Sequence, residues 1–235
     1  MFDQDEAPEA GRFRPSDYTA ALVQCLLADP ARIKGARVLE IGCGSGVLLA
    51  AAGAAGAAQL TGVDIEDDAV SATTALMIKQ GYMSVSDIHK GPLFTPVGRR
   101  QFDLVLANLP HFPMEQAAID GRLSSWSTGG ADGRKLLDGF LDGVLPHLAP
   151  GGQALVMHNA FIDLETTRKK AVQLGLSVSV VDSFMVPLPK EKLSVMTPDV
   201  LAREIGQTIF RFGCFAFGTV AVLRLTPSLT DGDHR

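Results

Sequence analysis

The sequence predicts an α/β fold, in which a doubly wound and mostly parallel sheet is covered by helices on both faces. Short apolar, β-branched segments alternate with longer segments of helical period, which is the pattern of successive βαβ units. The chain has 235 residues, of which 46% are hydrophobic and 20% charged, enough for one domain with a substantial core. No apolar run in the sequence approaches the roughly 20 residues that a membrane span needs.

The alternation begins with a helix, and each later strand is followed by one. The first segment, "SDYTAALVQCLL", has an apolar stripe of helical period that Ser16 or Asp17 can cap. The strand and helix pairs are "RVLEIG" with "GVLLAAAGAAG", "QLTGVD" with "DDAVSATTALMIKQ", "FDLVLAN" with "GRKLLDGFLDGVLPHL", and "GQALVMH" with "FIDLETTRKKAVQLG". Nearly continuous apolar strands are typical of parallel sheets that are buried on both faces.

The pattern changes after Leu176. Two long strand-like segments, "LSVSVVDSFMVPL" and "TIFRFGCFAFGTVAVLRL", have little helix between them. They predict an antiparallel pair at one sheet edge, where "GTVAVLRL" could serve as a dimer edge. We therefore expect a helical N-terminal segment over residues 1–36, one domain over 37–226, and a polar tail over 227–235.

Charge and cysteine content argue against several classes of protein. The formal net charge of -5 gives no overall attraction to phosphate backbones, so a nucleic-acid partner is possible but not favoured. The acidic start "MFDQDEAPEA" lacks the basic flank and apolar core of a leader, so we expect a cytoplasmic protein without a membrane partner. Cys25, Cys43 and Cys214 are far apart, and the histidines lack metal-ligand spacing. We predict no metal and three buried cysteines.

A glycine-rich turn follows the first strand. In "VLEIGCGSG", Gly42, Gly44 and Gly46 separate an apolar strand from a helix, and glycines there allow a tight turn and close approach of a ligand. Asp64 closes the next strand, about 20 residues on, where a carboxylate can accept hydrogen bonds from both ribose hydroxyls. Together these residues predict a nucleoside site.

Glu40 helps to decide which nucleoside binds. Dinucleotide folds prefer GxGxxG, with pyrophosphate at the helix N-terminus, and this chain has a different glycine spacing. A carboxylate just before the turn would repel a pyrophosphate but suits a ligand that carries an amine. The prediction is therefore S-adenosylmethionine (SAM) rather than NAD.

At these residues the chain resembles the class I SAM-dependent methyltransferases, from about Phe13 to the last strand. "VLEIGCGSG" and "GVDI" resemble the first two motifs of that family, and "SVSDI" resembles the third, whose acid contacts the adenine amine. The resemblance implies a seven-stranded Rossmann-like sheet with its last strand antiparallel. It also implies cofactor contacts from Thr19, Glu40, Gly42, Gly44, Gly46, Asp64, Ile65, Asp87, Ile88 and Asn108.

Asn108 ends the fourth predicted strand, within "LANLPHFP". Strands of an open α/β sheet direct their carboxyl ends at the ligand crevice, so Asn108 is expected to face the methyl donor. "NLPH" resembles the NPPY motif of methyltransferases that act on planar nitrogens, and the NLPY of rRNA adenine dimethylases. In those families the asparagine oxygen and the next carbonyl, here that of Leu109, accept the two N–H bonds of the substrate.

The rest of this motif supplies the other predicted catalytic residues. Leu109 replaces the first proline of NPPY, and Pro110 stiffens the turn and removes an N–H that would compete for acceptors. His111 replaces a tyrosine that stacks on the substrate; an imidazole can stack or take a proton, and Phe112 is the other candidate for stacking.

A longer resemblance narrows the group. "SSWSTGGADGRKLLDGFLDGVLPHLAPGGQALVM" is similar to a run of HemK-like protein-glutamine methyltransferases, and "FRPSDYTAALVQCL" is similar to their proline-x-x-x-threonine helix near the cofactor, with Thr19 as the threonine. Gly129 and Gly130 could let a loop close over substrate, and Arg134, a candidate substrate residue, could pair with an acid. Such proteins usually carry a recognition domain or a small partner protein.

The favoured function is N-methylation of a planar amide or amine nitrogen, with protein glutamine as the first choice of acceptor. Within the same chemistry, adenine N6 of RNA or DNA and a small-molecule acceptor remain alternatives. From other classes, an NAD(P)-dependent oxidoreductase and a non-catalytic SAM-binding subunit also remain. The glycine spacing counts against the oxidoreductase, and turnover of labelled SAM separates an enzyme from a binding subunit.

Overall fold

A computed structural model describes residues 15–114 and 128–228 of the chain. Its helices are α1 (Asp17–Leu27), α2 (Val47–Ala54), α3 (Asp67–Lys79), α4 (Lys135–Val144), α5 (Leu164–Gln173), α6 (Lys190–Val195) and α7 (Pro198–Glu204). Its strands are β1 (Arg37–Ile41), β2 (Gln59–Asp64), β3 (Ser86–Lys90), β4 (Phe102–Ala107), β5 (Leu148–Asn159), β6 (Leu176–Pro187), β7 (Ile209–Phe212) and β8 (Phe215–Pro227). The predicted α/β alternation is confirmed.

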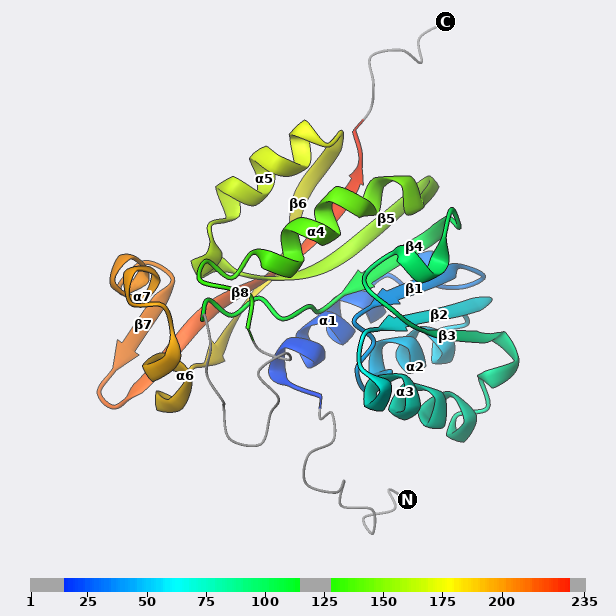
Figure 1. Cartoon of the computed structure of the whole chain (residues 1–235), viewed down its shortest axis with the longest axis horizontal. Coiled ribbons are helices and arrows are strands. Elements are labelled where there is room, and N and C mark those ends of the chain that lie inside the picture. Colours follow the sequence, from blue (N-terminus) through cyan, green and yellow to red (C-terminus); the bar gives the residue numbers. More distant parts are fainter. Residues whose placement is uncertain (1–14, 115–127, 229–235) are drawn as a thin grey trace, which may run out of the picture.

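One sheet runs through the whole fold, in the order β3-β2-β1-β4-β5-β8-β6. The strands from β3 to β5 are parallel. After β3 the chain returns to the other side of β1 and continues as β4, so the strand order reverses between β1 and β4 (Figure 1). Ligands of open α/β sheets bind at such a reversal, outside the carboxyl ends of the strands.

The C-terminal strands confirm one expectation and correct another. β8 is antiparallel to β6, as predicted, and also to β5. It therefore lies inside the sheet, and the expectation of a free edge at "GTVAVLRL" was wrong, because β6 is the outer strand. The segment predicted as one strand is a β7–β8 hairpin, since Gly213 adopts a φ of 62° in the turn. This short hairpin adds an eighth strand to the implied seven.

Helices cover both faces of the sheet, as a doubly wound fold requires (Figure 1). One apolar cluster joins α1, α2 and α3 to residues such as Val38 and Leu106, and the other joins α4 and α5 to residues such as Leu39 and Val105. Because side chains alternate along a strand, Glu40 shares the face of Val38. By the same alternation, Asn108 shares the face of Leu106, toward α1 and α2.

Helix α1 is part of this core. Ser16 caps it, and a capping box links Ser16 with Thr19. The buried side of the helix packs into the cluster on the α2 face and consists of Ala21, Leu22, Cys25 and Leu26. The predicted N-terminal helix therefore lies directly on the sheet.

Two further properties concern the described ranges alone. No helix there has the length and apolar character to cross a bilayer, and those ranges hold no cluster of three or more potential metal-ligating side chains. Cys25 and Cys43 are buried, as predicted. The prediction was wrong for Cys214, which is exposed because it lies in the β7–β8 turn.

The core makes a first testable prediction. Phe140 on α4 is fully buried, and its ring centroid lies 5.4 Å from that of Phe94. Phe140→Ala leaves a cavity and should lower the free energy of unfolding by about 3–5 kcal/mol, measured by urea denaturation. The control Val172→Ala, at an α5 position that is 67% exposed, should change it by less than about 0.5 kcal/mol. Equal losses in the two variants would contradict this packing.

Candidate active site

Three strands end at one level at the point where the strand order reverses. Ile41 of β1 pairs with Val63 of β2 and with Ala107 of β4. The next residues along these strands lie side by side: Gly42 follows β1, Asn108 follows β4, and Asp64 is the last residue of β2. The register therefore brings together the glycine turn, the acid and the asparagine that the sequence singled out.

The glycine turn and Asp64 form one hydrogen-bonded unit. Gly42, Gly44 and Gly46 have φ angles of 73°, 49° and 76°, which L side chains rarely adopt. The Asp64 carboxylate accepts the N–H of Gly44 at 2.9 Å and that of Glu66 at 3.0 Å. A Cβ on Gly42 would lie 3.0 Å from Leu109 Cδ2, so the turn also approaches the loop after β4 closely.

Glu40 lies beneath this turn with its carboxyl group buried. Its side chain is on the α2 face, and the residue is 3% exposed. Burial raises the pKa of Glu40 well above its ordinary value, and the charge of Asp64 acts in the same direction. Within the described residues Oε2 has no hydrogen-bond partner, which is unfavourable for a buried oxygen. A ligand with an amine would supply the missing donor, so these residues fit SAM.

The structure places Thr19 against Asn108. The Asn108 Nδ2 donates to Thr19 Oγ1 at 3.2 Å, across 89 positions of sequence. Both residues are half-buried, at the start of α1 and just beyond β4. Because Nδ2 faces α1, the other end of the amide, Oδ1, is directed elsewhere.

Past Asn108 the chain forms a tight loop. His111 Nδ1 hydrogen-bonds to the Leu109 carbonyl, and Pro110 between them is half-buried. A carbonyl oxygen has two lone pairs, so Leu109 retains one. Burial lowers the pKa of His111 to about 4, and the charge of Lys192 acts in the same direction. His111 is therefore neutral near pH 7.

Aromatic rings surround this loop. Phe112 is 5% exposed, and the Tyr18 ring meets His111 edge-on with centroids 5.8 Å apart. Lys192 on α6 places Nζ 5.2 Å from the Tyr18 centroid and 5.7 Å from that of Phe112, within the range of cation–π attraction. Lys192 thus connects α6 with α1 and with the loop after β4.

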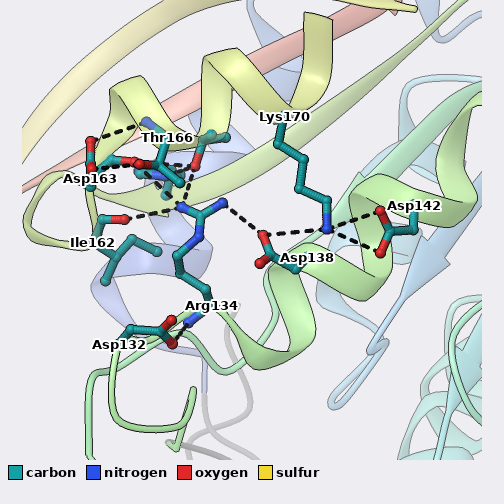
Figure 2. A network of polar contacts seen from close by, with 10 residues as sticks. Asp132, Arg134, Asp138, Asp142, Ile162, Asp163, Thr166 and Lys170 are labelled. Atoms are coloured by element: carbon teal, nitrogen blue, oxygen red, sulfur yellow. Dashed lines mark hydrogen bonds and ion pairs between the residues drawn. The ribbon is translucent and has the colours of Figure 1, made fainter. Parts of the chain in front are cut away.

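Arg134 is bonded to residues of α4, of α5 and of the segment before α5 (Figure 2). It is 7% exposed. Its guanidinium donates to the Ile162 carbonyl at 3.2 Å, to Thr167 Oγ1 at 2.8 Å and to Asp138 Oδ1 at 2.7 Å. The predicted pairing with an acid is found, with Asp138 on α4. The same bonds fasten the segment after β5 to the start of α4.

Gly129 and Gly130, which could let a loop close over substrate, make close backbone contacts in this structure. Gly129 donates its N–H to the Phe112 carbonyl at 2.7 Å, and the Gly130 carbonyl accepts the N–H of Met114 at 3.0 Å. A Cβ on Gly129 would lie 2.6 Å from the Gly133 carbonyl oxygen. These close contacts hold the segment before α4 against the loop after Asn108.

Asp87 bonds to residues outside the predicted set, and Ile88 packs against β2. Ile88 pairs with Gly62, two positions before Asp64, and its side chain packs toward Gly62. Asp87, one position earlier, bonds to Arg100 and His89, each at 2.8 Å. These bonds lower the pKa of Asp87, although partial burial acts in the opposite direction. The strand continues to Lys90, so neither residue lies at its carboxyl end.

Two features of the site were missed in the sequence. Gly91 follows β3 and donates its N–H to the Asp64 carbonyl at 2.8 Å. Gly91 and Pro92 therefore lie beside Asp64, the predicted ribose contact. Asn159 ends β5 and donates Nδ2 to the His111 carbonyl at 3.2 Å. Asn159 was detectable, because it follows an apolar strand as Asn108 does. On the same edge, Ile65 is 60% exposed beside Asp64.

This arrangement defines a class of enzyme, the methyltransferases that use SAM. Residues 38–128 match the family described as "Methyltransferase domain". Over 172 residues the chain is 32% identical to a proposed protein N5-glutamine methyltransferase of Methanocaldococcus jannaschii, an alignment that covers 73% of this chain and 85% of that protein. The chain belongs to the class I SAM-dependent methyltransferases of the HemK-like kind.

Other similar proteins share less sequence. A ribosomal RNA small subunit methyltransferase C of Chromohalobacter salexigens is 31% identical over 155 residues, which span 65% of this chain and 40% of that protein. The Mtq2–Trm112 complex of E. cuniculi gives a TM-score of 0.60 at 14% identity, covering 93% of this chain and 99% of the matched chain. A ribosomal protein L11 methylase of Lactobacillus delbrueckii gives 0.57 at 16%, covering 96% and 92%. These two structures share the fold.

The buried histidines predict a pH dependence of stability. Burial lowers the pKa values of His111 and His158 from 6.5 to about 4 and about 3, so at mildly acid pH the unfolded chain binds more protons than the folded chain. The free energy of unfolding should therefore fall by about 2 kcal/mol per histidine from pH 7 to pH 5, measured by urea denaturation. His111→Phe and His158→Phe should each make this fall smaller. Unchanged pH dependence in both variants would contradict the burial.

Proposed function

We propose that the protein transfers a methyl group from SAM to the side-chain amide nitrogen of a glutamine in a protein. The observation that carries the proposal is the position of Asn108, at the carboxyl end of β4, beside the glycine turn and hydrogen-bonded to Thr19. The name of the M. jannaschii relative supports an amide acceptor. Helix α1, in the predicted segment 1–36, then covers a site built by residues 37–226.

The cofactor residues follow from the geometry of the strand ends. Glu40 would accept the amine of SAM, the turn from Gly42 to Gly46 would lie along the ligand, and Asp64 would bind the ribose. Ile65 and the segment at Gly91 and Pro92 would flank the adenine. Asp87 is a poorer candidate for this contact, because its carboxylate is already bonded to Arg100 and His89. When bound, SAM supplies a methyl group: the nitrogen–carbon bond forms as the carbon–sulfur bond breaks, its electron pair stays on sulfur, and the nitrogen loses a proton.

The acceptor residues compensate for a weak nucleophile. An amide nitrogen delocalises its lone pair, so its reaction is accelerated by acceptors that favour the positive charge developing on it. Asn108 Oδ1 and the free lone pair of the Leu109 carbonyl would accept its two N–H bonds. They would also hold the nitrogen in line for transfer, and Pro110 adds no competing donor.

The surrounding residues would hold these acceptors in place. The His111 bond to Leu109 and the Asn159 bond to the His111 carbonyl fix the loop from both ends. His111 or Phe112 would pack against the planar acceptor, and His111, which is uncharged near pH 7, is the candidate to take the proton. Arg134 would act from behind, by fastening the end of β5.

The same acceptor pair could bind the exocyclic amine of adenine, which also has two N–H bonds. The net charge of -5 favours a protein or small molecule over a nucleic acid. The discriminating experiment is methyl transfer from labelled SAM to fractionated protein, RNA and metabolite pools, followed by proteolysis and mass spectrometry. N5-methylglutamine in a protein supports the proposal, and label confined to RNA or metabolites overturns it.

Removing the predicted ribose acceptor tests the cofactor site. Asp64→Ala should weaken SAM binding by about 1.5–3 kcal/mol, the range for hydrogen bonds to charged groups, measured by calorimetry. Asp87→Ala is the matched control, since its carboxylate is bonded to Arg100 and His89, and it should bind SAM with nearly wild-type affinity. Unchanged affinity in Asp64→Ala, or tighter binding of NADH than of SAM, would disprove the assignment.

Removing the predicted acceptor amide tests the chemistry. Asn108→Ala should lower kcat roughly 10²- to 10³-fold, as for other lost preorganised groups, with little change in SAM affinity. Activity should survive in His111→Phe if the ring packs on substrate and be lost if it is the base. Wild-type turnover by Asn108→Ala, or methyl groups found on oxygen or carbon, would rule out this role.

A further inference from the structure

We infer that Thr19 is a positioning residue, whose hydroxyl holds the Asn108 amide with Oδ1 toward the acceptor and Nδ2 toward α1. This inference rests on the proposed function, because it concerns how the acceptor nitrogen is received. It assigns Thr19 a role in the orientation of a catalytic group, distinct from the cofactor contact that the sequence resemblance implies.

The hydrogen bonds at the start of α1 make Thr19 an acceptor. The backbone N–H of Ser16 donates to Thr19 Oγ1 at 3.3 Å, and the Asn108 Nδ2 donates to the same oxygen at 3.2 Å. A hydroxyl oxygen has two lone pairs, and these two donors use both. The hydroxyl hydrogen has its own neighbour, Ser16 Oγ, at 3.4 Å.

This pattern selects one orientation of the amide. The two ends of an asparagine side chain have nearly the same shape, so packing alone does not distinguish them. With the amide reversed, Oδ1 would face Thr19. The Thr19 hydroxyl could then donate a hydrogen bond to Oδ1 only by turning its hydrogen away from Ser16 Oγ. The NH₂ end of Asn108 would then meet the NH₂ of the acceptor, so two donors would face each other.

The capping box adds rigidity to this arrangement. Ser16 and Thr19 bond to each other at the first turn of α1, and the helix is anchored by Leu22 and Leu26, which are buried in the core. The orienting hydroxyl is therefore attached to a fixed element. A side chain that holds a reacting group must itself be locked for the group to be preorganised.

Three variants separate orientation from the stability of α1. Thr19→Val keeps the shape and removes the hydroxyl, Thr19→Ser restores it, and Asp17→Ala removes an acid in the first turn of α1 that takes no part in the bonds between Ser16, Thr19 and Asn108. We expect kcat for methyl transfer from labelled SAM to the protein pool to fall roughly 10-fold in Thr19→Val, within the range for misplaced reacting groups. SAM affinity should change less than about twofold, and Thr19→Ser should recover most of the activity. Asp17→Ala should lower thermal stability slightly, because it removes a favourable charge at the helix N-terminus, while kcat stays near wild type.

A second measurement does not require a known acceptor. The side-chain ¹⁵N–¹H signals of Asn108 are identified by their loss in Asn108→Ala, in the protein without substrate. They should shift or broaden in Thr19→Val and stay near their wild-type positions in Thr19→Ser and Asp17→Ala. Thr19→Ala provides the same comparison if Thr19→Val does not fold.

The outcomes distinguish this inference from the proposed function. Unmoved Asn108 signals and wild-type kcat in Thr19→Val would overturn the inference alone. A loss of SAM affinity larger than the loss of kcat would also overturn it, in favour of a direct cofactor contact. If Asn108→Ala itself turned over at the wild-type rate, the proposed function would fail, while the NMR comparison would still decide whether Thr19 orients the amide.

Discussion

The register of β1 with its two neighbours is the constraint on which the site depends. Because Ile41 lies opposite both Val63 and Ala107, the glycine turn, the acid and the asparagine emerge at one level. A slip of one residue would turn every side chain of a strand to the other face, and Asn108 would then face away from Thr19. Apolar side chains on both faces of β1 and β4 oppose such a slip. The core therefore determines the geometry of the polar residues at its edge.

The same edge collects buried polar atoms that the fold does not satisfy. Within the described residues, Glu40 Oε2, His111 Nε2 and Asn159 Oδ1 have no hydrogen-bond partner, although most buried polar groups in proteins do. All three lie at or near the carboxyl ends of β1, β4 and β5. Desolvation of these atoms lowers the free energy of unfolding. The same desolvation is the main cause of the raised pKa of Glu40 and the lowered pKa of His111. A chain selected for stability alone would replace them with apolar residues.

The central strands and their polar ends could be predicted from the sequence, since buried parallel strands are unmistakable apolar runs and a polar residue marks where each stops. β3 gave no such signal. Its residues "SDIHK" are mostly polar because it is an edge strand, so its end was placed too early, at Asp87 and Ile88. The interior position of β8 and the bonds of Arg134 to Ile162 and Thr167 depend on pairings between distant segments. Local periodicity carries no information about those.

The interior position of β8 has a consequence for synthesis on the ribosome. β5 and β6 both pair with β8, so neither can complete its hydrogen bonds until β8, which ends at Pro227, leaves the exit tunnel. Until then β6 and the outer edge of β5 are unpaired in the nascent chain, and unpaired strands are targets for aggregation and chaperones. Asn159, at the end of β5, pairs with Val220 of this late strand. A product terminated shortly before β8 would therefore lack a complete site. Its unpaired strands would be exposed to chaperones and proteases.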